Sequence, residues 1–280
     1  MKLVISITSV LAILLIQPSS VSGDYWYGDF SDNRTLVFSE DAVMYDAPDL
    51  ASPVTALIPM GTDIRVSGST GEDIPVEGMR SYWYNVACTL NEIKYSGYMP
   101  GLYLAMSSLE LGTDTLFLFN ITGYVQEDYR FTASARIVIS GDIAAELEFP
   151  ATGNGFGEGP YSYCIRGTEL SREGLTGMRN LIELSFIYEA CGYLNRDVLL
   201  GWTSSDFIKG PEADSQFEAG IYHFNQTFII PSDSNGVSDE VTVLTSAEEW
   251  DEGIEDYTET ERYFEVYRWN GNEFIPPGEQ

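Results

Sequence analysis

Residues 131–139 read FTASARIVI, and apolar side chains alternate with polar ones along most of this stretch. Alternation with a period of two places one set of side chains on one face of an extended strand. The set that would share a face is Phe131, Ala133, Ala135, Ile137 and Ile139. The same pattern returns over 182–188 and, less regularly, over 222–230. Helical periodicity is nearly absent beyond residue 23, so the sequence predicts an all-β protein.

The chain is expected to close on a β-hairpin. Asn270-Gly271 lies between an alternating stretch at 263–269 and a short apolar one at 273–275. Asn-Gly tolerates the positive φ values of a type I′ turn, so we expect a two-residue turn here. The stretch 248–261 carries eight carboxylates, and 233–261 is therefore predicted to be a solvated acidic loop.

The N-terminus has the layout of a secretory signal. Lys2 precedes an uncharged apolar run at 3–16, and a polar stretch follows that ends at Gly23. The run is shorter than the roughly 20 residues that a membrane-spanning helix needs. We therefore expect residues 1–23 to be a signal peptide, and the remaining chain to be secreted or periplasmic without integral membrane association.

The charge of the chain restricts its partners. It has 43 acidic and 14 basic residues, and its net charge is −29. Such a surface repels polyphosphates over long distances, so nucleic acid is excluded as a partner. The same balance suits a saline medium, in which the self-repulsion is screened.

Cysteine and histidine offer little material for a catalytic or metal site. In an exported protein, three cysteines favour one disulfide and one buried thiol, and we predict Cys164–Cys191 as the disulfide, leaving Cys88. His223 is the only histidine, and its strand position suggests a structural role. Zinc-finger spacing and a serine-triad motif are both missing from the sequence, so we expect no metal and no cofactor.

Residues 42–106 carry four short motifs in a fixed order. They are PDLASPV at 48–54, a strand with a Pro-x-Gly turn at 56–66, WYNV at 83–86 and GYM at 97–99. This stretch resembles the bacterial SH3 (SH3b) family, a small barrel of exported and wall-associated proteins. It departs from the family pattern at Val43 and Tyr45 and in a lengthened loop at 69–81. An alternating core is expected from Val54, Ile64, Val66, Val86 and Met99.

The resemblance sets the expected domain organisation. We expect an SH3b-like barrel with an N-terminal lead over 24–108 and a larger antiparallel β-sheet or sandwich domain over 109–280. For the larger domain the sequence suggests no family.

The resemblance implies binding rather than chemistry, because the family often targets its owner to wall peptides or glycans. The expected ligand surface is aromatic, since tyrosine rings offer flat apolar faces with a polar edge. Its candidate residues are Tyr45, Tyr82, Tyr84, Tyr98 and Tyr103. The alternative interpretation is that most of these rings belong to the barrel core.

The favoured function is therefore a secreted, non-enzymatic protein that docks at the bacterial cell envelope. Two alternatives from other classes stay open. One is an extracellular hydrolase that uses a pair of carboxylates, which 43 acidic residues would always supply. The other is a calcium-dependent adhesion or surface protein, suggested by the acidic turn at 233–240.

Overall fold

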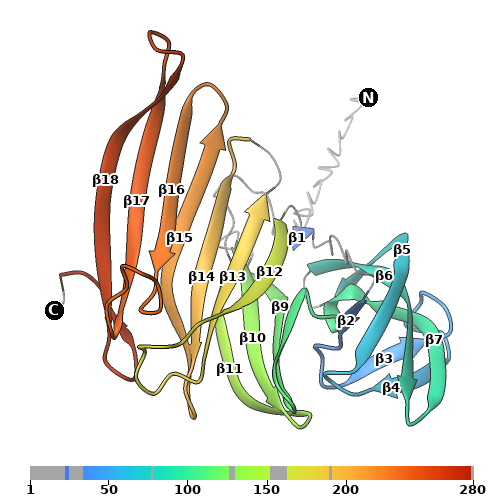
Figure 1. Cartoon of the computed structure of the whole chain (residues 1–280). Helices are drawn as coiled ribbons and strands as arrows, with labels where there is room; N and C mark the ends of the chain where they lie inside the picture. Colours follow the sequence, from blue (N-terminus) through green and yellow to red (C-terminus); the bar gives the residue numbers. More distant parts are fainter. Residues whose placement is uncertain are drawn as a thin grey trace, which may run out of the picture.

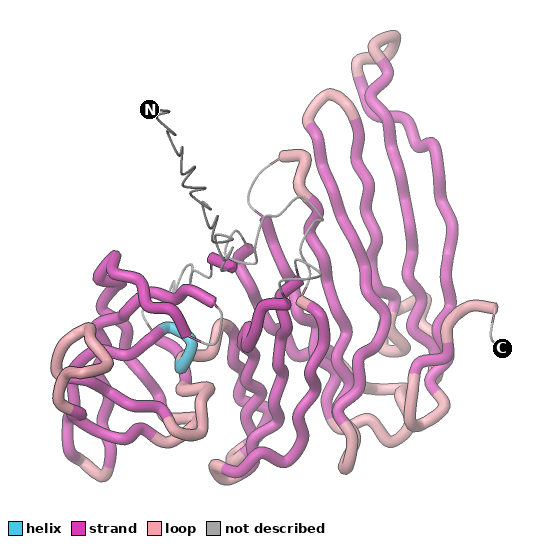
Figure 2. Tube along the Cα trace, turned by 180° about the vertical axis from the view of Figure 1, so that it is seen from behind, coloured by secondary structure: helices cyan, strands magenta, loops and turns pink. Residues whose placement is uncertain are grey.

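The computed structural model describes residues 23–24, 34–76, 79–125, 130–151, 163–188 and 191–278. Apart from Gly23, the predicted signal peptide lies outside these residues. They form strands almost throughout, and their only helix is one short 3-10 turn, η1 (Gly101–Tyr103) (Figure 2). The prediction of an all-β protein is confirmed. None of the described helical structure has the length and apolar character needed to cross a bilayer.

The N-terminal sheet contains seven strands in the order β2-β5-β6-β7-β3-β4, and the short β1 pairs with β6 in parallel (Figure 1). All its other pairings are antiparallel. The strands are β1 (Gly23–Asp24), β2 (Arg34–Leu36), β3 (Ala42–Tyr45), β4 (Val54–Ile58), β5 (Asp63–Val76), β6 (Met79–Leu90) and β7 (Ile93–Pro100).

The predicted core of this sheet is confirmed at four of its five positions. Ile64, Val66, Val86 and Met99 are buried, whereas Val54 is 57% exposed. Val54 is the first residue of β4, where a register shift between Met44 and Tyr45 interrupts its pairing with β3. A bulge of this kind changes which side chains point inward.

A second, four-stranded sheet has the order β11-β10-β9-β8. Its strands are β8 (Ser107–Gly112), β9 (Thr115–Val125), β10 (Arg130–Ile139) and β11 (Asp142–Pro150). Both of its faces are covered. On one face, Leu118 and Val138 pack with Phe38 and Met60 of residues 34–106, which we call the N-terminal part. On the other face, Phe117, Phe119 and other alternate residues contact the third sheet.

The third, large sheet is an antiparallel meander of eight strands, β12 to β19. Its strands are β12 (Tyr163–Leu170), β13 (Asn180–Tyr188), β14 (Leu194–Trp202), β15 (Phe207–Glu218), β16 (Tyr222–Ile229), β17 (Glu240–Asp251), β18 (Asp256–Trp269) and β19 (Phe274–Ile275). Its first strands pack on the four-stranded sheet, where the rings of Phe117 and Phe207 meet edge to face at 6.2 Å. Figure 1 shows β16–β18 extending beyond this sandwich. The alternating stretches at 131–139, 182–188 and 222–230 are therefore strands, as predicted.

The prediction of an acidic loop over 233–261 is wrong for most of its length. Residues 240–251 and 256–261 belong to β17 and β18, which pair antiparallel from Glu240 opposite Arg268 to Asp251 opposite Asp256. Val241, Val243 and Thr245 are buried and anchor β17. The backbone ladder and this buried row hold the strands together, while the carboxylates project into solvent.

The terminal hairpin lies where the sequence predicted it, but its turn is longer. Trp269 pairs with Phe274, so four residues connect the strands instead of two. The side-chain oxygen of Asn270 accepts hydrogen bonds from the backbone N–H groups of Asn272 and Glu273. Asn270 thus closes the loop with its side chain, as Asn often does in turns.

Gly97 illustrates a close approach between strands. A Cβ atom at this position would lie 2.3 Å from the carbonyl oxygen of Tyr45 on β3. We expect Gly97→Ala to lower the free energy of unfolding by about 2 kcal/mol, because the backbone of β3 must shift. Urea denaturation measures this loss. Gly112→Ala is the matched control, since the nearest atom to its Cβ would be 3.8 Å away. Equal stability of the two variants would contradict the close approach.

Candidate functional site

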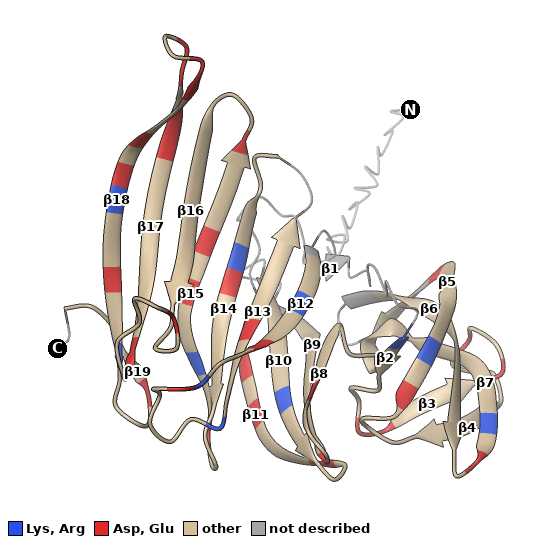
Figure 3. Cartoon of the chain, viewed as in Figure 1, with Lys and Arg blue, Asp and Glu red and all other residues tan. Residues whose placement is uncertain are grey.

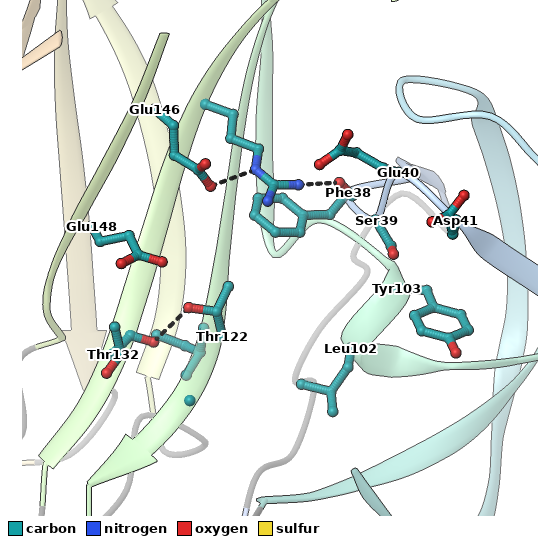
Figure 4. Close-up of a pocket in the computed structure, with 13 residues that line it drawn as sticks. Phe38, Ser39, Glu40, Asp41, Leu102, Tyr103, Thr122, Thr132, Glu146 and Glu148 are labelled. Carbon is teal, nitrogen blue, oxygen red and sulfur yellow. Dashed lines mark hydrogen bonds and ion pairs between the residues drawn. The ribbon is translucent and has the colours of Figure 1, made fainter. Parts of the chain in front are cut away.

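A cleft of about 540 Å³ lies between the N-terminal part and the four-stranded sheet (Figure 4). One wall comes from the turn before β3 and from η1, and the other from β9, β10 and β11. The polar lining residues are Ser39, Glu40, Asp41, Tyr103, Thr122, Thr132, Arg136, Glu146 and Glu148.

The two walls are held together by hydrogen bonds between segments far apart in the chain. Within the N-terminal wall, the N–H of Ala105 donates to the carbonyl of Leu36 at 2.9 Å. The N–H of Met106 donates to the carbonyl of Phe119 at 2.8 Å, which joins that wall to β9. The fully buried side chain of Asn120 donates from Nδ2 to the carbonyl of Leu102 at 2.9 Å. The cleft is therefore built into the packing of two sheets, and the turn at 38–41 completes its N-terminal wall.

Arg136 is the centre of this junction. Its side chain is 14% exposed, and its Nε lies 2.7 Å from Oε1 of Glu146. A terminal nitrogen donates to the carbonyl of Phe38 at 2.9 Å, and the guanidinium lies 4.2 Å from the centre of the Phe38 ring. One arginine thus joins β10, β11 and the N-terminal part through a salt bridge, a hydrogen bond and a cation–π contact.

Glu146 is held in its ionised form. Burial alone would raise its pKa, but hydrogen bonds from Ser134 and Arg136 and the charge of Arg136 outweigh burial and lower it. The hydroxyl of Ser134 donates to the same oxygen at 2.7 Å. Because Arg136 and Glu146 neutralise each other, the remaining charge of the cleft comes from other carboxylates.

Three further carboxylates leave the cleft negative. Glu40 and Asp41 lie on one wall and Glu148 on the other, as Figure 4 shows. Within the described part of the chain, none of the three forms an ion pair or a side-chain hydrogen bond. They are available to accept hydrogen bonds from amine or hydroxyl groups of a ligand. Tyr103 and Leu102 add an apolar surface beside them.

The five tyrosines predicted to bind a ligand do not form one surface. Tyr45 and Tyr84 are 8% and 3% exposed, so the prediction that they offer open faces is wrong. Tyr45 packs edge to face on Trp83, with ring centres 5.5 Å apart. Burial raises the pKa of Tyr84, and the nearby Tyr82 adds to the shift. Both rings belong to the core.

The other three tyrosines are partly buried. Tyr82 packs against the main core, and Tyr98 packs with Tyr45 and Trp83. Tyr103 is the one member of the predicted set that lines the cleft. The acidic residues of the cleft were not predicted, because nothing in the sequence separates them from the other carboxylates.

The predicted disulfide is also wrong, since Cys164 and Cys191 are both free thiols, as is the buried Cys88. Cys164 stands opposite Ile187 in the β12–β13 ladder. Cys191 lies beyond the end of β13, outside that ladder. The pairing register therefore does not bring the two sulfur atoms opposite each other.

The acidic turn suggested for calcium uses its carboxylates internally. Asp233 accepts a hydrogen bond from the N–H of Ile230 at 2.8 Å, and Asp239 accepts one from the N–H of Thr176 at 2.7 Å. Among the residues that the structure describes, no group of three or more acidic, His or Cys side chains is placed to hold a metal ion.

A second hollow, of about 820 Å³, lies on the N-terminal sheet, and we call it the basic hollow because its lining includes three basic side chains. It is lined by Arg34, Arg65 and Lys94, with Asp63 as the acidic residue among them. Arg34 stands directly opposite Arg65 and forms an ion pair with Asp63. Arg65 and Lys94 are exposed, and no ion pair to them occurs within the described residues. In Figure 3, the strands that carry these basic residues, β2, β5 and β7, lie far from the acidic end of the β17–β18 hairpin.

Among the residues that the structure describes, Glu183 and Asp197 on the large sheet are the carboxylates with raised pKa values. Burial raises the pKa of Glu183, and the charge of Asp197 adds to it. Burial also raises the pKa of Asp197, against a hydrogen bond from Ser185. Neither residue lines the cleft or the basic hollow, so this pair does not form a hydrolase site there.

The raised pKa of Glu183 gives a pH-dependent prediction. An acid whose pKa is higher in the folded state destabilises that state once the pH exceeds the ordinary value. We expect Glu183→Gln to raise the free energy of unfolding at pH 7 by about 0.5 kcal/mol, a value discounted for solvent screening. The gain should vanish below pH 4, where both states are protonated. Thermal melts at the two pH values measure it, with the exposed Glu110→Gln as control. An equal gain in the control would contradict the assignment to burial.

The fold and the cleft define an all-β protein built of three sheets, with a negatively charged cleft between the first two. Comparisons with protein-family models, with curated proteins and with solved structures found no match.

Proposed function

We propose that the protein is a secreted or periplasmic, non-enzymatic binding protein that docks at the bacterial cell envelope. Its N-terminal sheet acts as an SH3b-like module, and the adjoining cleft takes the ligand. That ligand is a wall peptide or glycan, recognised through its amine and hydroxyl groups.

The observation that carries this proposal is the composition of the cleft. Its two walls contribute Glu40, Asp41 and Glu148, which have no internal partner among the described residues, beside the ring of Tyr103. Carboxylates next to an aromatic ring suit a ligand that combines hydrogen-bond donors with an apolar body. The volume of about 540 Å³ falls within the usual range for ligand sites.

The charge distribution also supports docking through the N-terminal sheet. At short range the exposed Arg65 and Lys94 of the hollow favour contact with anionic groups of the envelope, and the acidic β17–β18 hairpin is repelled by the same groups. Both effects turn the N-terminal sheet toward the envelope and the β17–β18 hairpin away from it. They weaken with salt, because a Debye length of about 3 Å at 1 M screens exposed charges.

The test is retention of the purified protein, residues 24–280, on isolated wall sacculi. We expect the wild type to be retained and the double variant Asp41→Asn, Glu148→Gln to lose at least ten-fold in affinity. The control is Glu72→Gln, Glu110→Gln, which changes the net charge equally at exposed positions outside the cleft. No retention of the wild type, or equal losses in both double variants, would refute the proposal.

A further inference from the structure

A groove of about 420 Å³ crosses the strands β14 to β17 of the large sheet. The ladder sets its side chains in two rows on one face. Ser215 pairs with Asn225, and Asn225 pairs with Ser246. Phe217 pairs with His223, and His223 pairs with Glu248. A row of small polar groups therefore runs beside a row that contains aromatic rings.

This face is turned away from the four-stranded sheet. Phe186 packs on Phe119 of that sheet, and the neighbouring Ser185 points to the opposite side. Asp197 stands opposite Ser185 and shares its face, and Asn195 follows two residues away on the same face. Asn195 in turn pairs with Ser215, so the groove lies on the face of the large sheet that points away from the four-stranded sheet.

Four rings form a continuous series at one end of the groove. The ring centres of Phe217 and His223 are 4.3 Å apart, and those of His223 and Tyr257 are 3.9 Å apart in a stacked arrangement. Trp250 meets Tyr257 edge to face at 5.2 Å. The hydroxyl of Tyr257 accepts a hydrogen bond from the N–H of Gly220 at 2.8 Å, which fixes the series in place.

The rings are open to solvent where a core aromatic would be covered. Phe217 is 44% exposed and Trp250 is 37% exposed. His223, which lines the groove, has a buried Nε2 atom without a hydrogen-bond partner among the described residues. Buried polar atoms are nearly always paired, so this nitrogen is an unusual feature of the groove lining. The other ring nitrogen, Nδ1, lies 3.5 Å from Oε2 of Glu248.

The chemistry of the groove fits a neutral sugar better than a charged ligand. Asn195, Ser215, Asn225 and Ser246 are neutral groups that donate and accept hydrogen bonds, and Glu248 is the one carboxylate of the lining. A pyranose ring has a rim of hydroxyls and an apolar C–H face that packs on aromatic rings. A polyanion would be repelled by the surrounding acidic surface.

We propose that this groove is a saccharide-binding site for a neutral oligosaccharide or polysaccharide. The large sheet then has a binding task of its own, separate from the cleft. Phe217 supplies the stacking surface, and Asn225 and Ser246 hold the hydroxyls.

Affinity electrophoresis of the protein tests the proposal, in gels that contain a soluble β-glucan, a galactomannan or an arabinoxylan. We expect at least one polysaccharide to retard the wild type. Phe217→Ala and Asn225→Ala should each weaken that retardation at least five-fold. Phe264→Ala is the control, because this exposed aromatic of β18 does not line the groove.

Absence of retardation in all three gels, or unchanged retardation of Phe217→Ala, would overturn the proposal. The variant Asp41→Asn, Glu148→Gln should keep saccharide binding. This variant separates a failure of the groove from a failure of the cleft.

Discussion

Replacing Phe119 with alanine is expected to lower the free energy of unfolding by about 4 kcal/mol. Phe119 is fully buried, and its ring meets Phe186 edge to face at 5.8 Å across the two sheets of the sandwich. The centres of the Phe119 and Phe149 rings are 6.2 Å apart. Truncation removes these contacts and leaves a cavity. Because β9 is hydrogen-bonded to both β8 and β10, its backbone cannot move to close that cavity.

Urea denaturation followed by tryptophan fluorescence measures this loss. Phe264→Ala serves as the control, because Phe264 is 58% exposed and its removal should change stability by less than about 0.5 kcal/mol. A loss below 1.5 kcal/mol for Phe119→Ala would mean that the two sheets do not pack through this residue.

Arg136→Met is expected to lower the free energy of unfolding by about 3 kcal/mol, since removing one partner of a largely buried ion pair leaves the other uncompensated. Glu146 would lose its counter-charge, and the carbonyl of Phe38 would lose its donor. Because the pKa of Glu146 is lowered in the folded protein, its stabilising effect is complete above its ordinary value of 4.5. That effect is lost as the pH falls further. The difference between wild type and variant should therefore shrink below pH 4.

A second variant separates charge from packing. The double variant Arg136→Met, Glu146→Leu removes both charges and should recover part of the loss at pH 7. Denaturation curves at pH 7 and pH 3.5 give both quantities. A loss for Arg136→Met that is the same at the two pH values would contradict the role of the ion pair.

The strands were the part of this fold that sequence periodicity predicted well. Residues 131–139 and 182–188 alternate because one face of each strand is buried between sheets. The acidic hairpin is hard to predict because its density of carboxylates masks the alternation of Val241 and Val243. Backbone pairing tolerates exposed carboxylates on both strands. A local count of charges therefore does not show whether a segment pairs as a strand.

The candidate site was mostly beyond prediction. Glu40 and Glu148 lie more than a hundred positions apart in the chain, and only the packing of two sheets places them around one cleft. The burial of Tyr84 could have been predicted, because it alternates in phase with Val86 and Cys88, which are also buried. Tyr103 gave no comparable signal, since it lies in the short 3-10 turn.

Hydrogen exchange measured by mass spectrometry tests the central claim, which is that ligand binds in the cleft between the N-terminal part and the four-stranded sheet. The probe is the soluble fraction that a muramidase releases from isolated sacculi. Slower exchange on both walls, at residues 38–41 and 102–104 and at 121–123 and 146–149, is the predicted result. Unchanged exchange at these segments, or protection confined to one wall, would contradict the account.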